Sequence, residues 1–261
     1  MKIEKQILFV ANWKMYFAFD DDIRFVAEHY DKFIQLTDKI NYEIVVCPSF
    51  LAIPTLSQLF KATKIKLGAQ DCSEHNKGAF TGQVSAESLH DAGCSYCIVG
   101  HSERRMYNFE TDEAIAQKVN HLIEYNISPI ICIGENAEEY KSGKAFFVLE
   151  EQLEKIFPTI SSQCNKINSL PICIAYEPIW SIGTGIIPSE VHLKNVFTWL
   201  ATKTQKIAPT VNWKLLYGGS VKVETMPFLV KNLSDIHGFL IGGSSLDFQE
   251  FEKIVHYVLK A

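Results

Sequence analysis

The residue that most needs a chemical explanation in this sequence is Glu177, which closes the apolar run PICIAY and precedes the glycine-rich stretch PIWSIGTG. Burying a carboxylate at the end of a strand is unfavourable unless the charge is paired. His101 directly follows another apolar run, YCIVG, and Asn12 and Lys14 stand at and just beyond the end of a third, ILFVAN. A carboxylate base, a neutral imidazole donor and a lysine are groups suited to moving a proton next to a carbonyl.

Paired glycines end the last two apolar runs of the chain, in YGGS and IGGSS. Such pairs let backbone N–H groups approach a ligand without a side chain in the way, and loops at this position in barrels commonly bind phosphate. We therefore expect Ser220, Gly242 and Gly243 to bind a phosphate group. Gly183 would add another N–H when the loop after Glu177 closes over the substrate. Together these groups predict proton transfer in a small phosphate ester.

Each of these residues also has a purely structural interpretation. His101 could be a surface histidine before an exposed helix, Glu177 a strand-end carboxylate satisfied by backbone N–H groups, and Lys14 a solvated lysine. Their shared position at strand ends favours the functional interpretation. A helix beginning just after His101 would also disfavour its imidazolium form, because the helix N-terminus carries partial positive charge.

Eight short apolar runs position these groups. They cover residues 7–12, 43–48, 65–70, 96–100, 129–134, 171–177, 215–219 and 238–243. Near-continuous hydrophobicity is typical of strands buried on both faces of a parallel sheet. Amphipathic helical stretches lie between them, at 49–63, 112–125, 144–157, 189–207 and 247–260, with Thr111 or Asp112 as a cap for the second.

Strand followed by helix, eight times and without a linker, predicts an α/β protein with a single (β/α)8 barrel over residues 1–261. A doubly wound open sheet is the alternative. In a barrel the active site lies at the carboxyl ends of the strands. That end would gather Asn12, Lys14, Gln70, Asp71, His101, Glu103, Glu177, Ser220, Gly242 and Gly243.

Composition limits the classes of partner. The 261 residues carry a net charge of −5, which gives no reason to expect nucleic acid or an anionic membrane as partner. No apolar segment is long enough to span a bilayer, and the N-terminus does not resemble a signal peptide, so we expect a cytoplasmic protein. The seven cysteines, including the pair Cys94 and Cys97, predict neither a disulfide framework nor a metal site.

Seven motifs in order along the chain resemble the triosephosphate isomerase family. They are NWKM at 12–15, GAQD at 68–71, GAFTGQVSA at 78–86, VGHSERR at 99–105, YEPIWSIGTG at 176–185, YGGSV at 217–221 and GFLIGGSSL at 238–246. The resemblance extends over nearly the whole sequence. It implies interconversion of dihydroxyacetone phosphate and D-glyceraldehyde 3-phosphate through an enediol(ate) intermediate, in glycolysis and gluconeogenesis.

The resemblance also implies roles for individual residues. Glu177 matches the base, His101 the neutral electrophile, and Lys14 and Asn12 the groups that stabilise negative charge and contact substrate. Gly183, Ser220, Gly242 and Gly243 match the phosphate-binding positions. No metal ion and no organic cofactor are implied. The family is usually a homodimer, in which Thr81 would reach toward the neighbouring subunit's site.

The sequence departs from the family mainly in the loop after Glu177. Ser181 stands where the family often has Ala, and Ile186-Ile187-Pro188 where Lys-Thr-Ala or Lys-Val-Ala is common. Because proline fixes φ and restricts the residue before it, we hypothesise that lid opening or closing is altered. Phe109 stands where the family tends to have Gly. Two other functions remain open: a Schiff-base aldolase, which would need a desolvated lysine, and a catalytically silent binding or scaffold barrel.

Overall fold

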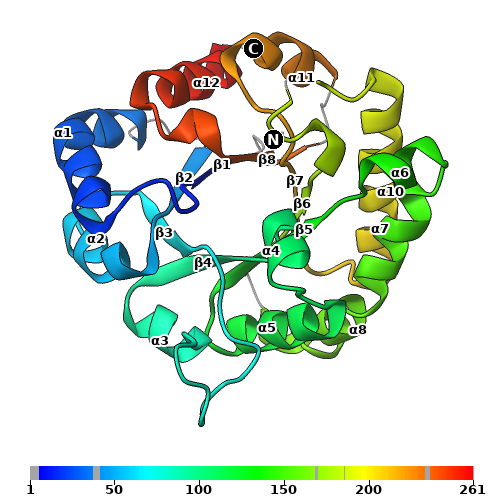
Figure 1. The fold of residues 1–261 in the computed structure, drawn as a ribbon, viewed down its shortest axis with the longest axis horizontal. Helices are drawn as coiled ribbons and strands as arrows, with labels where there is room; N and C mark the ends of the chain where they lie inside the picture. The colour runs from blue at the N-terminus through cyan, green and yellow to red at the C-terminus, as the bar shows by residue number, and fades with distance from the viewer. Residues whose placement is uncertain (1–5, 38–41, 168–169, 185, 233–235, 261) are drawn as a thin grey trace.

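The computed structural model describes residues 6–37, 42–167, 170–184, 186–232 and 236–260. Its strands are β1 (Ile7–Asn12), β2 (Tyr42–Cys47), β3 (Lys66–Ala69), β4 (Cys94–Val99), β5 (Ser128–Ile133), β6 (Pro171–Tyr176), β7 (Asn212–Tyr217) and β8 (Gly238–Ile241). They pair in parallel and in chain order, and β8 returns to β1 to close the barrel (Figure 1). The closed eight-stranded barrel confirms the predicted (β/α)8 fold and excludes the open sheet.

Both faces of the strands are buried, which explains why the runs read as continuously apolar. Alternate residues, among them Val10, Val45 and Ile130, belong to one buried cluster, and those between them, such as Phe9 and Ile131, belong to a second, larger one. Because successive strand residues point to opposite faces, the smaller cluster fills the barrel and the larger lies under the helices. Register is regular at β1 and β2, where Val10 pairs with Val45.

The longer helices form a ring outside the barrel (Figure 1). The α-helices are α1 (Phe19–Thr37), α2 (Ile53–Phe60), α3 (Ala86–Asp91), α4 (Ser102–Tyr107), α5 (Asp112–Glu124), α6 (Ala137–Lys141), α7 (Ala145–Glu154), α8 (Phe157–Ser162), α9 (Cys164–Ile167), α10 (Glu190–Ile207), α11 (Met226–Asn232) and α12 (Phe248–Lys260). Thr111 caps α5, accepting from the Ala114 N–H at 3.2 Å. The prediction of a single helix over 144–157 is wrong at its end. Helix α7 ends at Glu154, and a new helix, α8, begins at Phe157 with Pro158 in its first turn, where proline is tolerated.

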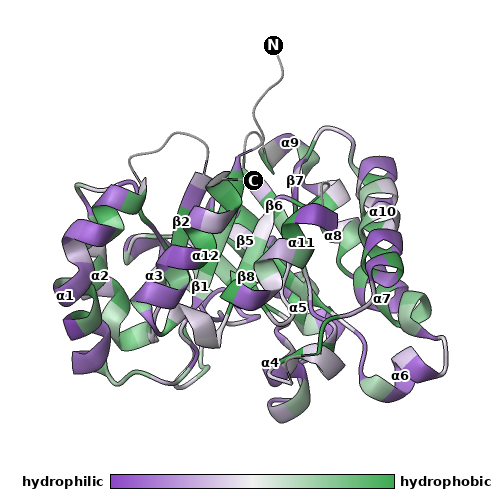
Figure 2. Ribbon diagram, turned by 90° about the horizontal axis from the view of Figure 1, so that it is seen from above, coloured by the Kyte–Doolittle hydropathy of each residue, from purple (hydrophilic) through white to green (hydrophobic). Residues whose placement is uncertain are grey.

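The side view separates the two ends of the barrel (Figure 2). Helices α4 and α6, which follow β4 and β5, lie at the lower edge of that view, and α9, which precedes β6, lies at the upper edge. The carboxyl ends of the strands therefore face downward in Figure 2 and toward the viewer in Figure 1. Among the described helices, none combines the length and hydropathy that crossing a bilayer requires.

The cysteine pair of the sequence belongs to a buried strand. Cys94 and Cys97 are both buried in β4, and neither forms a disulfide. Burial raises the pKa of the Cys94 thiol to about 12, so it stays protonated near neutral pH. In the described part of the chain no group of three or more His, Cys, Asp or Glu side chains is arranged to hold a metal ion.

Candidate active site

Glu177 directly follows β6 at the carboxyl end of the barrel and is 2% exposed. Its N–H donates to the Ile133 carbonyl at 2.7 Å, which extends the sheet pairing by one residue. Glycines lie on both sides of it: a Cβ on Gly134 would stand 1.8 Å from the Glu177 carbonyl oxygen, and one on Gly218 would stand 3.0 Å from Glu177 Cγ. Gly134, after β5, thus makes room for the Glu177 backbone, and Gly218, after β7, for its side chain.

The Glu177 carboxylate has two hydrogen-bond partners at the end of β4. Oε1 lies 3.1 Å from His101 Nε2, and Oε2 accepts the Ser102 N–H at 3.1 Å. Burial raises the pKa of Glu177, but His101, the Ser102 N–H and Lys14 lower it by more, so that the net shift is downward. The side chain is therefore held as a carboxylate, which is the form a general base needs.

His101 is the N-cap of α4, as expected for a helix starting immediately after it. Its Nδ1 accepts the Glu103 N–H at 3.2 Å, so the proton of the neutral ring resides on Nε2 and points at Glu177. Burial lowers the pKa of His101, while the carboxylates of Glu177 and Glu103 raise it, with a net rise in this arrangement. The bond that Nδ1 accepts from the Glu103 N–H requires the neutral ring, whereas the two carboxylates favour the imidazolium in this resting arrangement.

Lys14 lies just beyond the end of β1, in the same region, and has an unusual backbone conformation. Its φ is +52°, in the left-handed region, and its N–H donates to Asn12 Oδ1 at 3.1 Å. The Gln70 amide holds the Lys14 carbonyl at 2.6 Å, and Lys14 Nζ lies 2.6 Å from Glu103 Oε1. A Cβ on Gly242 would stand 3.2 Å from Lys14 Cε. The ammonium group therefore lies between the end of β8 and α4.

The loops after β7 and β8, in which we expect the phosphate to bind, contact each other. Ser244 Oγ donates to the Val221 carbonyl at 2.9 Å and ties the two loops together. Ser220 is 5% exposed, and its hydroxyl has no hydrogen-bond partner among the described residues. A Cβ on Gly243 would have no atom within 4 Å, so this backbone faces open space. Such a surface of open backbone and a spare hydroxyl is suited to binding phosphate.

The loop after Glu177 begins with a short 3₁₀ turn, Ile179–Ser181. Gly183 has φ +71° and is exposed, and a Cβ on it would meet no atom within 4 Å. Ile186 is 56% exposed, whereas Pro188 is buried. Gly185 lies outside the described residues. The altered lid kinetics expected from Ile186-Ile187-Pro188 stay a prediction.

The loop from Gln70 to Ser85 projects away from the barrel between β3 and α3 (Figure 1). Its base is closed where the Ser73 N–H donates to the Val84 carbonyl at 2.7 Å. Thr81 lies in its exposed part, which spans residues 77–83. The loop is thus held at its base and presents Thr81 outward rather than packing it on its own barrel.

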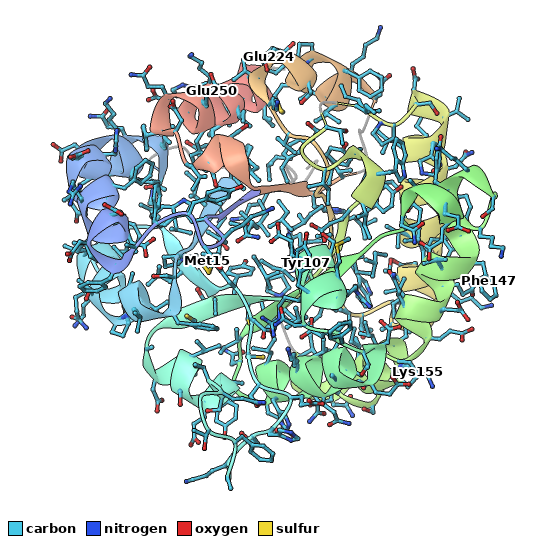
Figure 3. The ribbon with its side chains drawn as sticks, viewed as in Figure 1. Met15, Tyr107, Phe147, Lys155, Glu224 and Glu250 are labelled. Carbon is cyan, nitrogen blue, oxygen red and sulfur yellow. The ribbon has the colours of Figure 1, made fainter. Side chains whose placement is uncertain are left out.

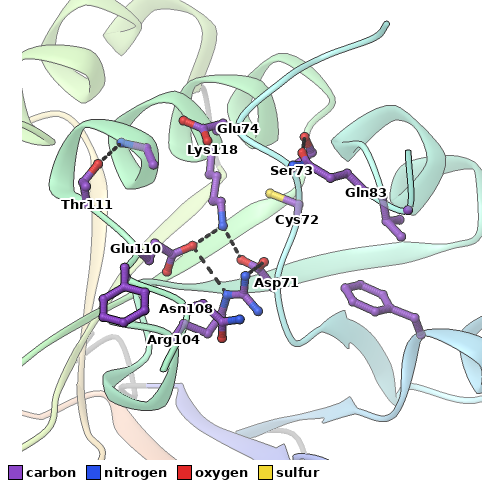
Figure 4. Close-up of a pocket in the computed structure, with 15 residues that line it drawn as sticks. Asp71, Cys72, Ser73, Glu74, Gln83, Arg104, Asn108, Glu110, Thr111 and Lys118 are labelled. Atoms are coloured by element: carbon purple, nitrogen blue, oxygen red, sulfur yellow. Dashed lines mark hydrogen bonds and ion pairs between the residues drawn. The ribbon is translucent and has the colours of Figure 1, made fainter. Parts of the chain in front are cut away.

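A second charged cluster, which the sequence did not indicate, includes Arg104 of α4 and lines a pocket (Figure 4). Lys118 is ion-paired with Glu110 and with Asp71, the latter at 2.8 Å, and Arg104 contacts Asp71 at 2.8 Å. Asp71, expected at the mouth with the other strand-end residues, is therefore engaged with this cluster. Beside it is a cavity of about 470 Å³ that is also lined by Glu74, Gln83 and Phe109.

Sequence reasoning also missed Ser102 and the two glycines beside Glu177. The signal for Ser102 was present in the first turn of α4, where backbone N–H groups are unpaired and favour anions. Gly134 ends one apolar run, and Gly218 is the first glycine of the pair that ends another. The sequence could not show that both would pack against the same glutamate.

A closed barrel that gathers a carboxylate, an imidazole and a lysine at the carboxyl ends of its strands has the architecture of a (β/α)8 enzyme. The sequence profile of triosephosphate isomerase matches residues 7–258. The chain is 36% identical to the triosephosphate isomerase of Aquifex aeolicus over 252 residues, covering 95% of this chain and 98% of that one. It is 38% identical to that of the Wolbachia of Brugia malayi over 254 residues, covering 97% and 98%. The chain belongs to the triosephosphate isomerase family and is an isomerase.

Proposed function

We propose that this chain interconverts dihydroxyacetone phosphate and D-glyceraldehyde 3-phosphate with Glu177 as base, His101 as electrophile, and Lys14 and Asn12 as stabilising groups. Glu177 takes a proton from the carbon next to the carbonyl and returns it to the neighbouring carbon. His101 Nε2–H donates to the oxygen that gains negative charge, and Lys14 stabilises that charge. The observation that carries the proposal is the buried Glu177 carboxylate, 3.1 Å from His101 Nε2 and with a lowered pKa.

The hydrogen bonds of Glu177 describe a resting position. Both carboxylate oxygens are engaged, by His101 and by the Ser102 N–H, so the side chain must leave these partners to reach a substrate carbon. The same departure frees His101 Nε2–H to donate to the substrate and removes the larger of the two carboxylate effects that raise the pKa of His101. Exclusion of water by the closing lid would then strengthen the base and every charge interaction in the site.

The phosphate group would occupy the loops after β7 and β8. The spare Ser220 hydroxyl and the open backbone at Gly243 support this placement, with Gly242 beside Lys14. Gly183 would bring its N–H to the phosphate when the lid closes. All the proposed groups belong to residues 1–261, which we infer act as one catalytic domain, in glycolysis and gluconeogenesis and in the cytoplasm.

We further propose that the chain is a homodimer in which Thr81 reaches the partner's site. Large apolar side chains are exposed at the carboxyl end of the barrel: Met15 by 95%, Tyr107 by 71% and Phe109 by 83%. Figure 3 places Met15 and Tyr107 over the barrel. Exposed apolar groups of this kind favour a protein interface. The projecting loop (Figure 1) and the 470 Å³ cavity at its base would allow a symmetric contact in which the loop of each subunit enters the other.

Sedimentation and activity at nanomolar concentration test the dimer. We expect the specific activity to fall as the dimer dissociates, and Thr81→Ala to lower activity without dissociating it. A fully active monomer would contradict this proposal and leave the assignments of Glu177 and His101 untouched.

A coupled assay of glyceraldehyde 3-phosphate isomerisation tests the catalytic roles. Glu177→Gln and His101→Ala should each lower kcat by about a hundred- to ten-thousandfold. Glu113→Gln, which changes a carboxylate on the exposed surface of α5 (67% exposed), is the matched control. Activity that survives in Glu177→Gln would exclude it as the base. A folded parent that binds phosphate ligands but does not turn over would instead favour the silent scaffold.

A further inference from the structure

One buried carboxylate lies between the two ends of the lid. Glu135, just beyond β5, is fully buried, and its Oε1 accepts from the Trp180 indole N–H at 2.8 Å and from the Tyr176 hydroxyl at 3.0 Å. The Glu135 carbonyl also accepts the Ile179 N–H at 3.1 Å. The first residues of the lid therefore dock on Glu135 through both backbone and side chain.

The helix that follows the lid reaches the same carboxylate. His192 lies in the first turn of α10, where the capping Ser189 hydroxyl accepts its N–H. Its Nε2 is 2.7 Å from the Tyr176 hydroxyl and 3.6 Å from Glu135 Oε1. Because the Tyr176 hydroxyl donates to Glu135, its oxygen accepts from His192 Nε2–H. Tyr176 of β6 and Trp180 of the lid thus donate directly to Glu135 Oε1, and His192 of α10 donates to the Tyr176 hydroxyl.

Tyr140 of α6 packs on both ends of the lid at once. Its ring stacks on Trp180, with centroids 4.3 Å apart and planes at 23°, and meets His192 edge-on at 4.9 Å and 80°. Figure 1 shows α6 beside α10 at the edge of the barrel. Glu135 and Tyr140 therefore form one rigid support for Trp180 and for the start of α10.

We propose that His192 is a positioning residue of the lid: it ties α10 to the Glu135 carboxylate that also holds Trp180, so that the open lid is anchored at both ends on one group. This inference rests on the lid role proposed for Gly183. Gly183 is exposed here, and we take this arrangement as the open lid. Bringing its N–H to a phosphate requires the adjoining turn at Ile179–Ser181 to move, and that movement strains the bonds to Glu135.

The importance of the His192 contact depends on how few hydrogen bonds hold the Glu135 carboxylate. Glu135 Oε2 has no hydrogen-bond partner among the described residues, so the bonds that Tyr176 and Trp180 donate to Oε1 hold the whole carboxylate. In such a buried network the loss of one donor weakens the others. Removing His192 should therefore loosen Trp180 and shift the lid toward its closed state. A ligand that requires the closed lid then binds more tightly, because less free energy is spent on closure.

The test compares His192→Leu, His192→Gln and the control His121→Leu in the full-length protein. His121 matches His192 in side-chain exposure, 15% against 12%, and likewise lies beside a glutamate, Glu124. The readouts are the ¹⁵N-indole signal of Trp180, assigned by its loss in Trp180→Phe, the dissociation constant of glycerol 1-phosphate, and kcat and KM measured separately.

In His192→Leu we expect the Trp180 indole signal to shift or broaden and the dissociation constant and KM to fall about three- to tenfold. His192→Gln, which restores a donor, should return both toward the parent values, and His121→Leu should match the parent. An unchanged indole signal, or weaker ligand binding in His192→Leu, would overturn the inference. Gly183→Pro, which removes the lid N–H, separates the two proposals: if it leaves ligand binding unchanged, the lid role itself is wrong.

Discussion

Helix α4 contributes to two charged clusters, Glu103 to one and Arg104 to the other, and the clusters differ in how their charges are paired. The Lys118 cluster consists of Lys118, Arg104, Asp71 and Glu110, and each of its two cations contacts both carboxylates. The Lys14 cluster consists of Lys14, Glu103, His101 and Glu177. There Lys14 is paired only with Glu103 among the described residues, and Glu177 is held by an imidazole and one backbone N–H.

The difference separates a structural charge cluster from the one that we propose to be catalytic. In the Lys118 cluster, two positive and two negative groups satisfy one another, so rearranging any of them leaves a buried charge unpaired. In the Lys14 cluster, Glu177 has no cation in direct contact among the described residues and stands between glycines, so it can change partners when substrate arrives. Of the two clusters, the one proposed to react is therefore the one whose buried carboxylate is held by an imidazole and a backbone N–H instead of by cations.

Breaking the Lys118 cluster should have the largest effect. Lys118→Met leaves Asp71 and Glu110 close together with only the partly exposed Arg104 between them, and we expect the free energy of unfolding to fall by about 3–5 kcal/mol. Denaturant unfolding measures this loss, and the folded fraction should keep most of its kcat. A loss below about 1 kcal/mol would mean that the cluster is solvated and weak.

The Lys118 effect also has a pH dependence. Burial lowers the pKa of Lys118, but Asp71 and Glu110 raise it by more, so the folded-state pKa lies above the ordinary 10.5. Its contribution to stability is therefore fully present below pH 10.5 and is lost as pH rises through the raised value. The difference in unfolding free energy between parent and Lys118→Met should stay constant at neutral pH and shrink only above pH 10.5.

Breaking the Lys14 cluster should affect catalysis instead. Lys14→Met removes the cation proposed to stabilise developing charge, and kcat/KM should fall by about a hundred- to thousandfold. Because the side chain is 18% exposed and its one ion pair is with a half-exposed glutamate, the melting temperature should change little. Steady-state kinetics and calorimetry on the same preparations measure both. Equal losses of stability in the two lysine variants would remove the distinction between the clusters.

The two lysines also show which parts of the site could be predicted from the sequence. Lys14 was located because it follows a strand-like apolar run, and the topology of a barrel brings all such strand ends together. Lys118 lies in the amphipathic stretch DEAIAQKVNHLIEY, where a lysine is most often solvated. Its partners Asp71 and Glu110 come from other segments, and only the packing of α5 against β4 brings them together. Strand ends were predictable from local pattern, whereas burial of a charged helix residue depended on tertiary contacts.

Phe109, which the sequence left unexplained, stands directly beside the Lys118 cluster. Its φ is +53° and its side chain is 83% exposed. A left-handed non-glycine residue costs about 1–2 kcal/mol, which accounts for the family's tendency to glycine there. Phe109→Gly should raise the stability of the isolated subunit by about 1 kcal/mol and weaken association of subunits.

The control for Phe109 is Tyr107→Gly, which removes an exposed aromatic ring from α4 without relieving a positive φ. It should lower stability, because glycine disfavours a helix by about 1 kcal/mol. Unfolding of the monomer at low protein concentration measures the effect of backbone strain on stability, and sedimentation measures the effect on association. If Phe109→Gly tightened the dimer, the exposed ring would not be an interface residue.

The smallest effect is expected in the lid, beyond Glu177. Replacing Ile186-Ile187-Pro188 with Lys-Thr-Ala removes a proline that fixes its own φ and restricts Ile187, and should speed lid exchange by about two- to fivefold. Relaxation dispersion at the Gly183 amide measures the rate. Ile186→Lys alone, at a site 56% exposed, changes the charge but leaves the proline, and should keep the parent rate. Identical rates in the triple replacement would mean that the lid's motion is set by its docking on Glu135 and not by its distal hinge.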